Sequence, residues 1–365
     1  MILLRDVLAA AAHTVGYVSS DPEDTWEQAA SAVGLPAASR YIVVLIDGMG
    51  LTQLEARRGH IPFLRRRNLQ SARTTVPSTT ACAISSIATG YDPGRTGMIG
   101  FTARDPESGS RIQLLSFADS PVTPEVWQAE PTIAQRADHH GTMCSIGPEK
   151  FRDSGLTLAA WRGMREVYAE TFEERVQAAL AQLNRGARLV YLYWADLDHA
   201  GHVHGWESEE WTAQLEHVDA QLSSLASALP RDSGLAITAD HGMVDISQRR
   251  DIAASPHATQ CVTAGEERML QVFVDEPDRV GEIAQHTATW LGDCARVWSR
   301  DDMLAALGGV SARVAPRVGD FAIVAEGTWG ISDSRWMSEN QMRLVGAHGA
   351  TSEAEMTVPL AVELS

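Results

Sequence analysis

Three short runs of apolar residues predict buried β-strands. They cover residues 41–46, 189–194 and 235–238 and are rich in β-branched and aromatic side chains. Because these runs do not alternate with polar residues, each strand is expected to be covered on both faces, as in parallel sheets.

Segments with helical spacing of apolar residues lie between these runs. Residues 172–186 and 211–229 follow this spacing, and the first segment ends in Asn-Arg-Gly, a helix stop signal. Strand, helix and strand in succession are typical of a doubly wound sheet. The pattern therefore predicts an α/β fold with a largely parallel central sheet.

The pattern changes between residues 245 and 345. Strand patterns at 268–274 and 321–327 lie around helical patterns at 278–292 and 300–308. A further His-Gly pair follows this interval, so the main fold is expected to resume there. We therefore expect a single domain over residues 1–365 with a small α+β cap or insertion subdomain at 245–345.

Composition and charge narrow the class of protein. The chain has 365 residues, 44% of them hydrophobic, which is enough for a large core. Its formal net charge of −17 would repel nucleic acid backbones and anionic membranes, so we expect neither as a partner. A small anion can still bind at a local cationic site. The sequence leaves the oligomeric state open.

The four cysteines are scattered and form no Cys-x-x-Cys pair. This spacing predicts neither a disulfide framework nor a thiolate zinc site. The first residues lack the basic start and cleavage site of a signal peptide, and no apolar stretch is long enough to span a membrane. We therefore expect a cytoplasmic protein.

Acidic residues follow each of the three predicted strands. Asp47 follows the first strand, and Asp198 and His202 lie just after the second. Asp240 and His241 follow the third. Ligands of open α/β sheets bind beyond the carboxyl ends of the strands, so these side chains are expected at one edge of the sheet.

Carboxylates gathered at one edge would repel one another unless cations lay between them. The accompanying histidines favour zinc over magnesium, with manganese as an alternative. Asp198 and His202 are spaced to share one face of a helical turn, and Gly201 permits close approach. The alternative is a polar surface loop without a metal. Three further polar residues of this segment are expected to support the ligands or to be solvated: Asp196, His199 and His204.

Hydroxyl side chains stand at the start of a helix predicted at residues 80–89. Ser78, Thr79 and Thr80 follow Pro77 there. Free backbone N–H groups at a helix start bind phosphate-like anions, and a hydroxyl at that place can attack phosphorus when a metal stabilises its alkoxide. The alternative is that these hydroxyls only cap the helix.

Five segments match the pattern of a known family. In chain order they are VLIDGMG (44–50), VPSTTACAISSIATGYDPGRTGMIGF (76–101), DHAGHVHG (198–205), TADHGM (238–243) and GAHGA (346–350). Together they resemble the alkaline phosphatase superfamily and, within it, the type I phosphodiesterase and nucleotide pyrophosphatase family. The resemblance runs from about residue 40 to the end. It implies an alkaline-phosphatase-like three-layer fold and a metal-dependent hydrolase of phosphoric esters with a small phosphorylated substrate.

The resemblance also implies roles for individual residues. Thr80 corresponds to the family's nucleophile, which stands three residues after a proline, here Pro77. It would attack phosphorus and form a covalent phosphothreonine, which a metal-bound water then hydrolyses. Two divalent metal ions are implied, the first at Asp47, Thr80, Asp240 and His241, and the second at Asp198, His202 and His348.

One departure from the family pattern concerns substrate binding. Family members carry an Asn after the helix that binds a phosphate oxygen, whereas this chain has Gly100 and Phe101 in that region. We expect Thr102 to contact the substrate there beside Phe101, with Arg104 or backbone N–H groups as alternatives.

Aromatic residues near the end of the insertion are the next candidates. Trp329, Trp336 and His257 fall in or beside the part of the chain that covers the active site in related enzymes. An aromatic ring there can stack on a leaving group, but packing in a core is the simpler interpretation.

Alternatives to the leading prediction, a phosphodiesterase or nucleotide pyrophosphatase, stay open. A phosphomonoesterase and a phosphonate hydrolase, which cleaves a carbon–phosphorus bond, belong to the same superfamily. A non-catalytic protein that binds metal or phosphate on the same scaffold is a further alternative, although such a protein would not need Thr80.

Overall fold

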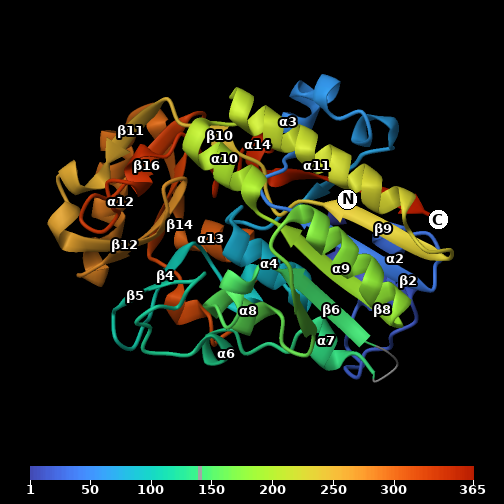
Figure 1. Cartoon of the computed structure of the whole chain (residues 1–365). Helices are drawn as coiled ribbons and strands as arrows, with labels where there is room; N and C mark the ends of the chain where they lie inside the picture. Colours follow the sequence, from blue (N-terminus) through green and yellow to red (C-terminus); the bar gives the residue numbers. More distant parts are fainter. Residues whose placement is uncertain (139–141) are drawn as a thin grey trace.

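The computed structural model describes residues 1–138 and 142–365. At its centre lies an eight-stranded sheet with the order β1-β3-β18-β9-β2-β8-β6-β7 (Figure 1). The strands are parallel except for β18, which pairs antiparallel with β3 and β9. Their bounds are Ile2–Leu3 (β1), Gln70–Arg73 (β3), Thr357–Leu364 (β18), Ser233–Thr238 (β9), Arg40–Ile46 (β2), Ala187–Trp194 (β8), Thr142–Gly147 (β6) and Arg165–Tyr168 (β7).

The three predicted apolar runs are confirmed as β2, β8 and β9. These strands are neighbours in the middle of the sheet. Both faces of β2 are buried along residues 41–46, which explains why its sequence does not alternate. β8 begins two residues before its apolar run because its backbone pairing with β6 continues to Ala187.

Helices cover both faces of the central sheet, which gives the expected three layers (Figure 1). One face is covered by α9 (Phe172–Asn184) and α11 (Glu209–Ser227), and the other by α1 (Asp6–Thr14), α2 (Trp26–Val33) and α4 (Thr80–Thr89). Helix α11 begins two residues before its apolar pattern because the Ser208 side chain accepts the Trp211 N–H and caps it.

The interval between residues 245 and 345 contains a four-stranded antiparallel sheet. Its order is β12-β13-β15-β14, and α12 (Val280–Leu291) and α13 (Arg300–Ala306) pack against β14. Short strands at the two ends of the interval, β10 and β17, pair with each other, so the chain leaves and rejoins the main fold at one place. The division into one domain with a cap subdomain stays a prediction. The remaining bounds are Cys261–Glu266 (β12), Met269–Val274 (β13), Phe321–Ala325 (β15), Ala295–Ser299 (β14), Val244–Asp245 (β10) and Gly346–Ala347 (β17).

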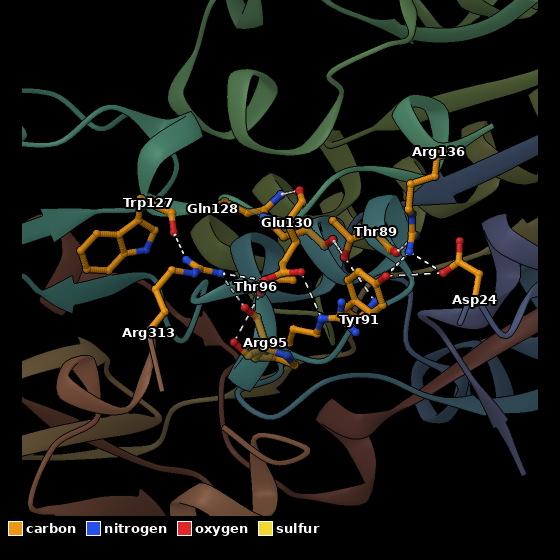
Figure 2. Close-up of polar contacts among 12 residues, drawn as sticks. Asp24, Thr89, Tyr91, Arg95, Thr96, Trp127, Gln128, Glu130, Arg136 and Arg313 are labelled. Carbon is orange, nitrogen blue, oxygen red and sulfur yellow. Dashed lines mark hydrogen bonds and ion pairs between the residues drawn. The ribbon is translucent and has the colours of Figure 1, made fainter. Parts of the chain in front are cut away.

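The far end of α4 is held by a buried polar network (Figure 2). The guanidinium of Arg136, only 3% exposed, donates to the Thr89 carbonyl at the C-terminus of the helix. The same group donates to Asp24 and to the Tyr91 hydroxyl. A cation is favourable at a helix C-terminus, so this network fixes the helix that carries Thr80 at its other end.

A second part of the network joins the insertion to the segments after α4 (Figure 2). Arg313 donates to the carbonyls of Trp127 at 2.7 Å and Arg95 at 2.9 Å, and it pairs with Glu130 at 3.1 Å. The insertion and the segments after α4 also share apolar packing. Met269 of the insertion lies in one apolar cluster with residues that follow α4. The insertion is therefore packed against the main fold.

Two further features of the structure concern the expected cellular location of the protein. Within residues 1–138 and 142–365, no helix is long and apolar enough to cross a membrane. The four cysteines are free thiols, and all of them are buried.

Candidate metal centre

The sheet topology brings five separate segments to one edge. The neighbouring parallel strands β9, β2 and β8 end there and are followed by Asp240, by Asp47 and by α10 (Asp196–His204). Because β18 is antiparallel, it starts at this edge, and the segment before it brings His348. Strand β3 ends at the same edge, and the chain then enters α4 at Thr80.

The first group of predicted ligands is gathered and buried. The candidate ligand atoms of Asp47, Asp240 and His241 all lie within 4.8 Å of one another. His241 Nε2 is 3.4 Å from Asp47 Oδ1 and 3.4 Å from Asp240 Oδ2. Thr80 Oγ1 lies 3.1 Å from the same nitrogen. The structure thus brings Thr80 beside the group to which the family resemblance assigns it.

The second group, Asp198, His202 and His348, is also gathered within 4.8 Å. Because α10 is helical from Asp196, Asp198 and His202 share one face, with 3.2 Å between Oδ2 and Nε2. His348 Nε2 is 3.9 Å from Asp198 Oδ1. The rings of His348 and His241 stack with their centroids 3.5 Å apart, so the two groups are adjacent.

Two glycines permit this close approach. Gly48 has a φ of +72°, and a Cβ there would lie 3.0 Å from the Asp198 Cα. A side chain at this position would therefore strain the backbone and displace the helix that carries Asp198. At Gly201, as the sequence indicated, a Cβ would meet Met243 Sδ at 2.5 Å.

The backbone fixes the orientation of the three imidazoles. Each Nδ1 lies within hydrogen-bond distance of a main-chain carbonyl, which leaves Nε2 directed toward the carboxylates. This is the arrangement by which metal-binding histidines are usually held. The pairs are His241 with Gly242 (3.0 Å), His202 with Gly346 (2.8 Å) and His348 with Ser78 (2.9 Å).

Each carboxylate has one oxygen with a close polar partner and one buried oxygen without a hydrogen-bond partner among the described residues. The unpaired atoms are Asp47 Oδ1, Asp198 Oδ1 and Asp240 Oδ2. A buried acceptor without a partner is costly, and a carboxylate more so, but a divalent cation would satisfy all three. The donor set of carboxylates and imidazoles therefore fits two divalent metal ions. The paired oxygens accept from Tyr193 (Asp47), from the backbone of Gly48 and His241 (Asp240) and from His202 (Asp198).

The electrostatics of the two groups differ. Burial and the charges of Asp240 and Asp198 raise the pKa of Asp47 well above its usual range, and burial also raises that of Asp240. Burial acts in the same direction on Asp198, but His202 and His348 outweigh it and lower its pKa. Burial would lower the pKa of His202, yet Asp198 raises it to about 9. The pKa shifts of the carboxyl groups therefore run upward in the first group and downward in the second.

The hydroxyls before α4 do not cap the helix. Thr79 is the N-cap residue, but its side chain accepts no helix N–H. Ser78 donates to the Ala350 carbonyl at 2.7 Å and accepts the Gly349 N–H at 3.1 Å. Thr80 faces His241 instead of the helix backbone. The capping alternative therefore does not account for these side chains.

A cavity of about 640 Å³ opens beside both groups. Asp47, Thr80 and Asp198 are among the residues that line it. Its walls are largely aromatic and apolar, and the chain's single lysine also lines it: Ile84, Phe101, Leu115, Lys150, Phe151, Leu156, Trp161, Val167, Tyr168, Tyr191 and Tyr193. The three supporting residues expected from the sequence are all exposed, and two of them, Asp196 and His199, line this cavity while His204 does not.

The two predicted substrate-binding residues are placed differently. Phe101 lines the cavity, but Thr102 is not among the described residues that do so. The buried Thr102 hydroxyl donates to the Gly265 carbonyl at 3.0 Å and accepts the Gly265 N–H at 2.8 Å. The Thr102 hydroxyl thus forms its hydrogen bonds with the insertion. A contact between Thr102 and the substrate stays a prediction.

Glu266, at the end of β12, is a residue that the sequence did not single out. It accepts the Phe101 N–H at 2.6 Å, and its other oxygen is buried without a partner among the described residues. Burial raises its pKa to about 8. A smaller cavity of about 160 Å³ is lined by Glu266 together with His202 and His348. No motif marks this residue, because only the folding of the insertion brings it here.

Of the aromatic candidates in or beside the insertion, one lines a cavity beside the metal centre and two do not. Trp336 lines the smaller cavity and donates from Nε1 to Thr263 Oγ1 at 2.8 Å. Trp329 packs against the apolar cluster of the insertion. His257 lines neither cavity and instead pairs with His286.

Among the comparisons with known proteins, a family model identifies the family, and solved structures show the fold. The family model for type I phosphodiesterase / nucleotide pyrophosphatase matches residues 41–351. No curated protein sequence matches the chain. Murine ectonucleotide pyrophosphatase / phosphodiesterase 5 has a similar structure, with a TM-score of 0.71, 18% identity and coverage of 89% of this chain and 88% of that chain.

Two further solved structures contain ligands. Phosphonoacetate hydrolase from Sinorhizobium meliloti 1021, in complex with phosphonoacetate, has a TM-score of 0.71 at 17% identity, over 91% of this chain and 92% of that one. The same murine protein, described as inactive with a threonine-to-alanine substitution and in complex with AMP, has a TM-score of 0.70 at 17% identity, over 88% and 87%. At such identities the likeness shows the fold alone.

Proposed function

The chain belongs to the type I phosphodiesterase / nucleotide pyrophosphatase family, and on that premise we propose that it is a two-metal hydrolase of phosphoric esters with Thr80 as its nucleophile. One observation carries this proposal. Three buried carboxylate oxygens without a hydrogen-bond partner among the described residues and three imidazole Nε2 atoms gather in two adjacent groups, and the Thr80 hydroxyl lies 3.1 Å from one of these nitrogens. The same groups would be a destabilising arrangement in a protein without cations.

The side chains divide into two ligand sets. Asp47, Asp240 and His241, with Thr80, would hold one ion, and Asp198, His202 and His348 the other. When bound, divalent ions would neutralise the carboxylates and stabilise the charge on the attacking and leaving oxygens. Imidazole ligands favour zinc, with manganese as the alternative.

The chemical steps follow from the position of Thr80 at the start of α4. Its hydroxyl gives its proton to water while the Oγ1 electron pair forms a bond to phosphorus. The bond from phosphorus to the leaving oxygen breaks, and that oxygen takes a proton from water. A water molecule then attacks the phosphothreonine, the bond between phosphorus and Oγ1 breaks, and Thr80 recovers its proton. The N-terminal N–H groups of α4 favour the phosphate-like anion throughout.

The cavity supports a preference for diesters or pyrophosphates of small molecules. Its volume of about 640 Å³ lies within the range of small-molecule pockets, so it has room for an organic substituent on phosphorus in addition to the reacting group. Aromatic walls suit an aromatic or apolar substituent. The murine relative is described in complex with AMP, and its inactive form carries a threonine-to-alanine substitution, which supports a threonine nucleophile.

Phosphonate hydrolysis is the second candidate, and Lys150 is the observation that favours it. This residue is the chain's single lysine, and it lines the cavity. An ammonium there would pair with a carboxylate on the substrate. The similar phosphonoacetate hydrolase is described in complex with a ligand of that kind, phosphonoacetate.

A substrate panel separates these candidates. Purified protein loaded with zinc or manganese is assayed with bis(p-nitrophenyl) phosphate, p-nitrophenyl phosphate and phosphonoacetate. We expect the diester to give the highest kcat/KM and Thr80→Ala to lower kcat by at least about a thousandfold, while the ions at Asp198, His202 and His348 remain. Thr89→Ala, at the other end of the same helix, is the matched control and keeps its rate. Near-normal turnover by Thr80→Ala would refute the nucleophile, and preference for phosphonoacetate would establish the second candidate.

The cellular location is part of the proposal. Four free, buried cysteines support a reducing compartment and hence the cytoplasm. Fractionation of cells that express the tagged protein tests this, and recovery outside the cytoplasm would contradict it.

A further inference from the structure

A second kind of histidine cluster lies on the insertion. It consists of His257, just before the short turn Ala258–Gln260, and of Glu282 and His286 on α12. One ligand atom from each residue lies within 4.8 Å of the others. None of the three is among the described residues that line the two cavities beside Thr80. The cluster is therefore separate from the centre described above.

The two imidazoles are held edge to edge. His257 Nε2 and His286 Nδ1 are 2.8 Å apart, and the ring planes differ by 11° with their centroids 5.0 Å apart. A hydrogen bond between these two nitrogens needs one of them to donate and the other to accept. Glu282 and His286 are four residues apart on one helix face, with 3.9 Å between Oε1 and Nδ1.

An outer set of hydrogen bonds orients the potential ligands. His257 Nδ1 is 3.1 Å from the amide oxygen of Gln260, which accepts only, so this nitrogen carries the proton and Nε2 presents its lone pair to the cluster. Arg279 donates to the same Gln260 oxygen at 3.0 Å and to both oxygens of Glu282, at 2.7 and 3.1 Å. Ligating histidines and carboxylates are commonly held in this way by a surrounding shell.

We propose that His257, Glu282 and His286 form a zinc-binding site on the insertion, outside the catalytic cavity. Two imidazoles and one carboxylate are a known zinc donor set, and they leave a fourth position for water. Calcium and magnesium prefer oxygen ligands and would find one carboxylate here, already shared with Arg279. Zinc binds the Nδ1 lone pair of His286 after the proton there moves through solvent to Nε2 of the same ring, so no net proton is lost.

Binding needs the two nitrogens to move apart and both rings to turn so that their lone pairs point at the ion. Zinc–nitrogen bonds of roughly 2.1 Å in a tetrahedral site separate the two nitrogens by about 3.4 Å. The present 2.8 Å must therefore open by a few tenths of an ångström. The His286 side chain is 54% exposed and free to make that shift. The ion would join the turn before β12 to α12, and β12 ends at Glu266 beside the catalytic centre.

The test is the difference in zinc content between matched variants. Wild-type protein, His286→Gln and His60→Gln are dialysed to equilibrium against micromolar zinc and analysed for metal per chain. His60 is the control because it is also about half exposed and paired with a glutamate, Glu216. We expect His286→Gln to hold one equivalent fewer than the wild type, and His60→Gln to hold the same number.

The difference does not depend on the catalytic ions. With or without those ions, the wild type binds one more equivalent of zinc than His286→Gln. The metal-loaded proteins have the same catalytic turnover. His257→Gln should repeat the loss, and calcium in place of zinc should show no difference between the proteins. Equal zinc content in wild type and His286→Gln would overturn the proposal.

Discussion

Removing the divalent ions should destabilise the fold, and Asp47→Asn should reverse part of that effect. Without cations, three carboxylate oxygens are buried without partners among the described residues. Each such atom costs about 1–3 kcal/mol, which gives about 3–9 kcal/mol in total. With an unfolding entropy of about 2.1 cal/mol/K per residue over 365 residues, the melting temperature should fall by roughly 4–12 °C.

Calorimetry of the metal-loaded and chelator-treated protein at neutral pH measures this shift. Asp47→Asn removes a charge that burial and two neighbouring acids disfavour, so it should stabilise the metal-free protein by about 1–3 kcal/mol and destabilise the loaded one. Asp219→Asn is the control, because this buried carboxylate accepts the backbone N–H groups of Phe63 and Leu64 and is not among the candidate metal ligands, so its substitution should weaken both forms equally. A melting temperature unchanged by chelation, or an Asp47→Asn effect of one sign in both forms, would refute the reasoning.

Three further substitutions test other parts of the site. Burial raises the pKa of Glu266 to about 8 from its usual value near 4.5. Between these two pH values the unfolded chain releases the Glu266 proton while the folded chain keeps it, so the free energy of unfolding should fall with rising pH by up to about 5 kcal/mol. Urea titrations should show this pH dependence in the wild type and its loss in Glu266→Gln. An equal slope in both proteins would contradict a buried neutral Glu266. Tyr193→Phe removes the hydrogen bond to Asp47 and should weaken metal binding by about 10–100-fold in competition titrations, whereas unchanged affinity would deny Tyr193 that supporting role. Gly48→Ala places a Cβ 3.0 Å from the Asp198 Cα at a positive φ and should lower both thermal stability and metal content; normal values for both would contradict the packing described.

Much of the centre could be predicted because its chemistry is local in sequence. Asp47, Asp198 and Asp240 each follow a strand within a few residues, and parallel neighbouring strands bring their ends together. The apolar runs of β2, β8 and β9 are unambiguous because these strands are buried on both faces. His348 was assigned only through the family resemblance, since no apolar pattern marks the loop before β18.

What could not be predicted depends on tertiary packing. Glu266 reaches Phe101 only because the sheet of the insertion packs beside α4. Tyr193 lies inside an apolar run, where its hydrogen bond to Asp47 leaves no trace in the pattern. Thr102 was expected at the substrate, but no local signal could reveal that Gly265 takes both of its hydrogen bonds.

The central claim is that two divalent ions hold these acids and imidazoles around Thr80. Anomalous diffraction at the zinc absorption edge, from crystals grown with zinc, measures this directly. The account predicts two peaks at the centre, one among Asp47, Asp240, His241 and Thr80 and one among Asp198, His202 and His348. Crystals that contain zinc but show no anomalous peak at either group would contradict it.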